Sequence, residues 1–156
     1  MLVSKQIAKH LRDVFFGGNW TSVNLKDTLN NIGWEEATTS SYSLNSIAKL
    51  TFHINYYVSA ILKVVRGGPL DAHDKYSFDC PPIQSRFDWE KLVNKTFTEA
   101  ELLAVHIEEF PDDQLDKNFA DEKYGSNYRN FQGLIEHTHY HLGQIALIKK
   151  MLGQQP

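Results

Sequence analysis

Two histidines near the C-terminus, His137 and His141, lie four residues apart in a stretch whose residues favour a helix. At 3.6 residues per turn, this spacing places their side chains about 40° apart on one face of the helix, one turn from each other. Two imidazoles in this arrangement can bind one divalent metal ion without any rearrangement of the backbone. His139 lies about 200° around the helix from His137, so its side chain must point elsewhere.

A third metal ligand must come from another helix, and His53 is the best candidate in the sequence. The apolar residues around it recur every three or four positions, which predicts a helix with a buried face that contains Ile47, Leu50, Ile54, Tyr57, Ile61 and Val65. His53 lies beside this face, so its side chain is expected to point into the core or to its edge.

Three protein ligands that leave a fourth position open are typical of catalytic zinc. Nitrogen ligands also fit nickel, copper or iron, whereas magnesium and calcium prefer oxygen.

Each histidine also has a simpler interpretation, as a packed core residue or a surface residue. With seven histidines in the chain, a pair at this spacing arises by chance in roughly a quarter of random shuffles. The prediction of a metal site therefore rests on the pair together with an inward histidine from a second long helix, because facing helices assemble metal sites in bundle cores. The simpler interpretation is preferred for the remaining four, which are His10, His73, His106 and His139.

Two further side chains are expected near the three histidines. Gln144 follows His137 by seven residues and returns to nearly the same helix face, where it could hydrogen bond to a ligand. Tyr57 follows His53 by four residues and could line the cavity. For both, packing or a hydrogen bond between helices is the preferred interpretation. Cys80 has no neighbouring motif and is interpreted as an ordinary loop residue.

The helices that must carry these residues are predicted from apolar periodicity and from residues that start or end helices. They cover about residues 3–16, 24–31, 43–66, 88–110 and 129–152. The predicted N-caps of the second, third and fourth of these are Asn24, Ser43 and Asp88. Residues 69–87 form a long connection of the kind that serves as a crossover or a functional lid. Because an alternating β pattern is scarce, an all-α bundle with one or more long connections is predicted.

Composition indicates the setting in which the protein works. The 156 residues are expected to form a single domain, 1–156, with a core of its own. The net charge of −3 and the lack of a basic cluster argue against binding to nucleic acid. One cysteine excludes an internal disulfide framework and fits a reducing compartment. Charged residues interrupt both the N-terminal segment and the apolar run 44–65, so neither a signal peptide nor a membrane span is expected, and the predicted location is cytoplasmic.

The chain resembles the DinB/YfiT-like superfamily of metal-binding four-helix bundles over about residues 3–153. The last-helix motif His137-x-x-x-His141-Leu-Gly-Gln144-Ile carries most of this resemblance. The segment from Ser46 to His53, followed by Ile-x-Tyr-Tyr, is similar to the region of the family's first ligand, and the segments 25–33 and 112–116 are similar to its connectors. The resemblance implies an up-down-down-up bundle with a long crossover, a homodimer, and a zinc or nickel ion held by the three histidines.

The resemblance also implies a set of activities. Members of this superfamily include metal-dependent transferases that use bacillithiol, mycothiol or glutathione, and a thiol-dependent isomerase. We therefore expect a metal-dependent enzyme, a thiol S-transferase by this resemblance, in which a low-molecular-weight thiol is deprotonated for attack on a small electrophile. No general acid or base stands out near the histidines. The alternatives are a DinB-like stress protein that binds a metal or small ligand without turnover, and a structural dimer module.

Overall fold

The computed structural model describes residues 2–40 and 43–153; the remaining residues of the predicted single domain lie outside the described part. Within these ranges the chain forms six α-helices and three short 3₁₀ turns, and its only β feature is an isolated bridge between Asn118 and Ser126. The α-helices are α1 (Val3–Phe16), α2 (Leu25–Leu29), α3 (Trp34–Thr38), α4 (Ile47–Val65), α5 (Arg86–Glu108) and α6 (Asn127–Leu152). The predicted all-α class is confirmed for the described residues.

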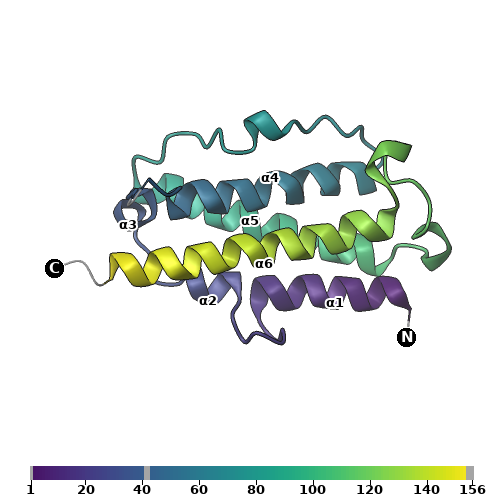
Figure 1. Ribbon diagram of the computed structural model, residues 1–156, viewed down its shortest axis with the longest axis horizontal. Coiled ribbons are helices and arrows are strands. Elements are labelled where there is room, and N and C mark those ends of the chain that lie inside the picture. Colours follow the sequence, from purple (N-terminus) through teal and green to yellow (C-terminus); the bar gives the residue numbers. More distant parts are fainter. Residues whose placement is uncertain (1, 41–42, 154–156) are drawn as a thin grey trace.

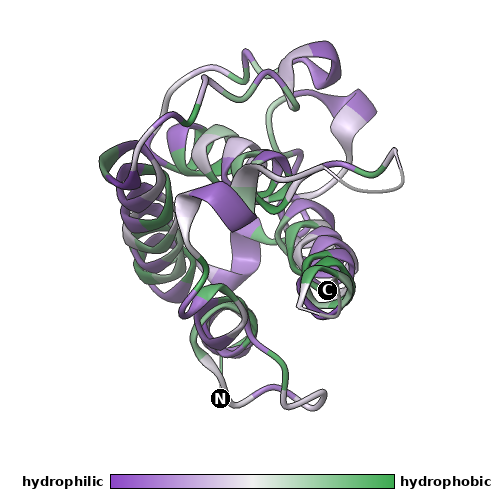
Figure 2. Ribbon diagram, turned by 90° about the vertical axis from the view of Figure 1, so that its left-hand side faces the viewer, coloured by the Kyte–Doolittle hydropathy of each residue, from purple (hydrophilic) through white to green (hydrophobic). Residues whose placement is uncertain are grey.

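The four long helices α1, α4, α5 and α6 lie side by side along the long axis of the molecule (Figure 1). The contacts between them link α4 with α5, α1 with α5, α4 with α6, and α1 with α6, so that each long helix packs against two others. Viewed end-on in Figure 2, each long helix carries both hydrophobic and hydrophilic residues. The shared core contains the largest fully buried side chains, which include Ile7, Leu11, Phe15, Ile54, Leu103, Ile107, Phe131, Ile135 and Ile145. Burial of each such side chain contributes about 1.5–3 kcal/mol.

The helix starts differ from two of the three predicted N-caps. Asn24 caps α2 as predicted, because its side chain accepts a hydrogen bond from the backbone N–H of Asp27. The prediction that Ser43 begins the next long helix is wrong: Ser43 has a positive φ of 61°, and Ser46 is the N-cap of α4. Asp88 is also not a cap. It forms a capping box with the true N-cap, Ser85, in which the Ser85 hydroxyl donates to the Asp88 carboxylate and accepts from its backbone N–H.

The predicted buried face of α4 is correct at its centre and wrong at two positions. Ile47, Leu50, Ile54 and Ile61 are buried, whereas Tyr57 and Val65 are only partly buried. Among the described residues, no helix combines the length and apolar character needed to cross a membrane.

A long connection, residues 66–85, leaves α4 and runs along the outside of the helices to α5 (Figure 1). Polar contacts with α4 hold it in place. The Tyr57 hydroxyl donates to an Asp74 carboxylate oxygen at 2.8 Å, and the Tyr56 hydroxyl hydrogen bonds to the backbone of His73. These contacts bring Ser77 and Phe78 against the middle of α4, where His53 lies.

Candidate metal centre

The structure brings the three predicted ligands together between α4 and α6. His53 lies in the middle of α4, and its Nε2 atom is 3.0 Å from the Nε2 atom of His137 on α6. His141 follows one turn later on α6, and the candidate ligand atoms of all three residues lie within 4.8 Å of one another. His53 is 6 % exposed and His141 is 8 % exposed. The three imidazoles therefore form a mostly buried cluster that draws on two different helices.

The spacing of these nitrogens fits a transition-metal ion. Zinc–nitrogen bonds of about 2.0–2.1 Å place two imidazole nitrogens of a tetrahedral site about 3.3–3.4 Å apart. The 3.0 Å between His53 and His137 is close to this value. The widest pair is within 4.8 Å. Three neutral nitrogen ligands suit zinc or nickel better than magnesium or calcium.

Hydrogen bonds fix two of the imidazoles in the form that binds metals. The Nδ1 atom of His53 is 3.2 Å from the backbone carbonyl oxygen of Ser77, and the Nδ1 atom of His141 is 2.7 Å from Oε1 of Gln144. Carbonyl oxygens only accept, so each Nδ1 atom carries the proton and leaves the Nε2 lone pair free for a metal. The Nδ1 atom of His137 is buried and has no hydrogen-bond partner among the described residues.

Burial keeps all three imidazoles uncharged at neutral pH. Desolvation, together with the nearby His141 and His53, lowers the pKa of His137 to about 4. Burial also lowers the pKa of His53 and of His141, although the hydrogen bonds to Ser77 and Gln144 oppose this effect. Because metals bind the neutral imidazole, the site does not need to release protons before it can bind an ion near pH 7.

The lowered pKa of His137 predicts that the metal-free protein loses stability in acid. Between its ordinary pKa of about 6.5 and the folded-state value of about 4, the unfolded chain binds a proton that the folded chain does not. The free energy of unfolding is therefore expected to fall by about 2–3 kcal/mol between pH 7.5 and pH 4.5 through this residue. Urea unfolding in the presence of a chelator measures this change.

The matched variant for this measurement is His137→Gln, which cannot take up the proton. It should show a smaller loss of stability over the same pH range than the wild-type protein. An identical pH dependence in the two proteins would contradict the prediction, since carboxylates elsewhere in the chain would then account for the whole effect.

Aromatic side chains contact all three imidazoles of the cluster. The Phe78 ring stacks on the His53 ring with 3.8 Å between centroids. Tyr57 makes edge contacts with His53 and His137, at 5.2 and 4.7 Å. Tyr140 makes a similar contact with His141 at 4.9 Å. Phe78 and Tyr57 are partly buried and shield the imidazoles from water in part, whereas Tyr140 is exposed.

The structure places Tyr57 and Gln144 beside the cluster, where they were expected. Tyr57 packs on two of the imidazoles, and its hydroxyl group donates to Asp74. Burial, followed by this hydrogen bond, raises the pKa of the Tyr57 hydroxyl, so it stays protonated at neutral pH. Gln144 contacts His141, three residues before it, rather than His137.

No family model, no curated protein and no solved structure matches the chain in comparisons with known proteins.

The other histidines lie outside the cluster, as predicted. His139 faces His10 of α1, with 6.2 Å between ring centroids. His106 accepts a hydrogen bond from the Arg66 side chain. His73 lies in the connection 66–85, where its backbone contacts Tyr56.

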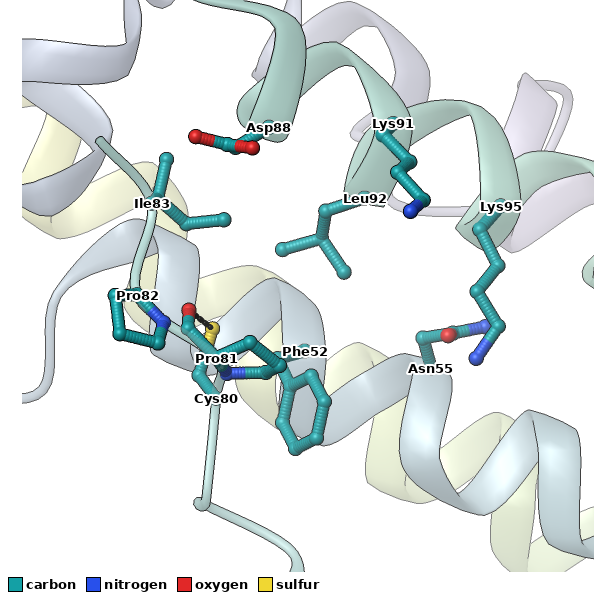
Figure 3. A pocket seen from close by; sticks show the side chains of 10 residues that line it. All are labelled: Phe52, Asn55, Cys80, Pro81, Pro82, Ile83, Asp88, Lys91, Leu92 and Lys95. Carbon is teal, nitrogen blue, oxygen red and sulfur yellow. Dashed lines mark hydrogen bonds between the residues drawn. The ribbon is translucent and has the colours of Figure 1, made fainter. Parts of the chain in front are cut away.

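Cys80 lies in a separate cavity of about 220 Å³ that none of the three clustered histidines lines (Figure 3). Its thiol lies beside Pro81 and Phe52, and Lys91 and Lys95 project toward the same space from α5. Burial raises the pKa of this thiol. A thiol that stays protonated is a poor metal ligand, because metals bind the thiolate. This geometry supports the interpretation of Cys80 as a loop residue.

Ser77, Asp74 and Phe78 contact the site but were not among the predicted site residues. All three belong to the long connection, which has no periodic pattern from which their direction could be derived. The Pro81-Pro82 pair and the absence of a helical period mark the segment only as irregular.

The hydrogen bond from His141 to Gln144 gives a second prediction. Replacing Gln144 with leucine keeps the side-chain volume similar but removes the acceptor, so the affinity for Zn²⁺ should fall by about 10–100-fold. A competition titration against a chelating dye measures the affinity. The matched control is Gln132→Leu, on the same helix but away from the cluster, which should bind as tightly as the wild-type protein. Equal affinity of the two variants would rule out this role of Gln144.

Proposed function

We propose that this protein is a metal-dependent enzyme that transfers a low-molecular-weight thiol to an electrophile, a thiol S-transferase. The observation that supports this most is the convergence of three imidazoles from two helices, with no Cys, Asp or Glu joining the group in the described part of the chain. Three protein ligands and one exchangeable position are the pattern of catalytic zinc sites. When bound, zinc or nickel supplies a positive charge that favours the thiolate over the thiol at neutral pH.

The charge balance of the ligand set supports an anionic substrate. Three neutral imidazoles leave the whole charge of a divalent ion uncompensated by the protein. A thiolate is then the favoured incoming ligand, because it adds negative charge and because soft sulfur binds zinc well. The partly buried rings of Phe78 and Tyr57 pack against the imidazoles and strengthen this attraction by displacing part of the surrounding water.

The residues of the chain itself would bind the metal ion, orient the imidazoles that hold it and displace water from around them. Ser77 and Gln144 hold His53 and His141 with their Nε2 atoms free. Asp74 holds the Tyr57 hydroxyl, which keeps the tyrosine ring against the imidazoles.

The directions of the four long helices and the assembly of the protein are also proposed here. We propose that α1, α4, α5 and α6 form an up-down-down-up bundle of the DinB/YfiT-like type, which assembles as a homodimer in the cytoplasm. The long connection between α4 and α5 supports this order, because a crossover of this length allows two successive helices to run in the same direction. The homodimer follows from the family resemblance, and the location follows from composition.

Conjugation of thiols to a model electrophile tests the proposed activity. Protein loaded with Zn²⁺ or Ni²⁺ is incubated with bacillithiol, mycothiol or glutathione and a chloronitrobenzene. We expect metal-dependent formation of the thioether with at least one thiol, and a loss of the activity in His53→Ala but not in His139→Ala. No conjugation above the His53→Ala background, with any of the three thiols, would refute the transferase.

A binding protein without turnover is the second candidate, and one observation favours it. In the described chain, the Tyr57 hydroxyl is engaged by Asp74, and no carboxylate belongs to the histidine cluster, so a general acid or base is missing. Saturable thiol binding to the metal-loaded protein without any product after long incubation would favour this candidate.

A further inference from the structure

A groove of about 450 Å³ opens beside the metal centre, between α4 and α6. One end of it is formed by the candidate ligand His137 and by Tyr57, and the other end by Arg129 and Asn130. Arg129 and His137 are eight positions apart on α6, which corresponds to about 12 Å along the helix at 1.5 Å per residue. The groove therefore leads from the centre to a cationic side chain near the start of α6.

Arg129 keeps its charge available at the outer end of the groove. Its side chain is exposed, and its Nη1 atom donates to the carbonyl oxygen of Tyr124 at 3.2 Å. It takes part in none of the ion pairs formed by the described residues. Its remaining N–H groups are therefore free to bind an anion, and the planar guanidinium group matches a carboxylate with two parallel hydrogen bonds.

The rest of the groove is shaped for an elongated molecule. Gly133 lies between the two ends, and a Cβ atom added there would meet nothing within 4 Å. Ile61 and Leu134 supply apolar walls. Glu136 lies next to His137 and carries a negative charge, which disfavours a second anion close to the metal centre. An anionic group of a bound molecule is therefore favoured at the Arg129 end.

We propose that this groove binds the carboxylate-bearing arm of the thiol substrate, with Arg129 as the carboxylate anchor. The inference rests on the proposed function, in which the sulfur of the thiol is bound at the histidine cluster. It narrows the substrate class to thiols whose carboxylate lies roughly 8–12 Å from the sulfur, the span set by the helix rise between the two ends of the groove. Arg129 acts here as a specificity-determining residue that touches the substrate and not the reacting sulfur.

Binding to the Co²⁺-loaded protein tests this inference without any need for turnover, because coordination of sulfur to Co²⁺ produces a charge-transfer absorption band. The probes are unbranched mercaptocarboxylic acids of increasing length and their neutral amides. In the wild-type protein, acids of matching length should bind about tenfold more tightly than their amides, as expected for a charge-assisted hydrogen bond. Acids too short to reach Arg129 should show no preference.

Two variants and a control distinguish carboxylate binding by Arg129 from an overall loss of thiol or metal binding. Arg129→Gln should reduce the preference for the acid to less than twofold and leave the affinities for the amides and for Co²⁺ unchanged. Arg86→Gln, an exposed arginine on α5, should keep the preference. Gly133→Leu places a side chain in open space and favours the helix, so it should fold, fill the groove and weaken binding of the long acid at least tenfold while the smallest thiol binds normally.

The possible outcomes distinguish this inference from the proposed function. If thiols bind but acids and amides bind equally, or if Arg129→Gln weakens both to the same extent, the carboxylate anchor is refuted and the thiol-binding metal centre stands. If no thiol produces the absorption band in a protein that binds Co²⁺, the proposed function fails, and the inference fails with it.

Discussion

Replacing His53 or His141 with alanine is expected to lower the affinity for Zn²⁺ by about a hundred- to a thousand-fold. Structural zinc sites with four protein ligands bind with about 10–16 kcal/mol, so each ligand contributes about 2.5–4 kcal/mol. The two residues come from different helices and their candidate ligand atoms belong to one cluster, so the loss of either should have a similar effect. Calorimetric titration, or competition with a chelating dye for the tightest sites, measures the affinity.

His139→Ala is the matched control for these variants. His139 lies on α6 two residues from each of the two α6 ligands, but its ring faces His10. The variant should therefore retain the affinity of the wild-type protein. If all three variants bind Zn²⁺ equally, or if the purified wild-type protein takes up no stoichiometric metal, the histidines are packing residues and the structural dimer module becomes the better interpretation.

Removal of the metal should also destabilise the folded protein. An ion held at a free concentration a thousand times its dissociation constant stabilises the native state by about 4 kcal/mol. For a chain of this size each kcal/mol shifts the melting temperature by about 2–4 °C, so a chelator is expected to lower it by about 8–16 °C. The physical reason is that an ion bound by His53, His137 and His141 would link α4 to α6, because these residues come from both helices.

The expected change is specific to the histidine cluster. Scanning calorimetry of the wild-type protein and of the His53→Ala, His141→Ala double variant, each with Zn²⁺ and with a chelator, measures it. The double variant should melt at the same temperature in both conditions. An equal shift in the two proteins would mean that Zn²⁺ stabilises the fold through other surface groups.

Much of the helical architecture could be predicted, because apolar periodicity and the residues that start or end helices mark the long helices. The bounds predicted for the first helix, 3–16, are those of α1. The errors concern short-range features. The five-residue helix α3 is too short to show a period, and the choice between Ser43 and Ser46 as N-cap depends on the backbone conformation of the preceding turn.

The residues of the candidate site also fall into a group that the sequence predicts and a group that it does not. His137 and His141 could be predicted because helix geometry alone places them on one face, and His53 because it lies beside the buried stripe of α4. Ser77 and Phe78 could not be predicted, because the path of the connection 66–85 depends on contacts with residues distant in the sequence. Gln144 could be placed near the ligands from its helix face, and which of them it contacts, His141, is seen only in the structure.

The hydrogen bond that orients His53 has a consequence for how such sites are recognised. Its acceptor is the main-chain oxygen of Ser77, an atom that every residue type possesses. What this hydrogen bond requires is therefore the backbone position of residue 77 and not a particular side chain. The Ser77 hydroxyl takes no part in this hydrogen bond and donates instead to the carbonyl oxygen of Asp74. A comparison of side chains alone would therefore not detect what orients His53.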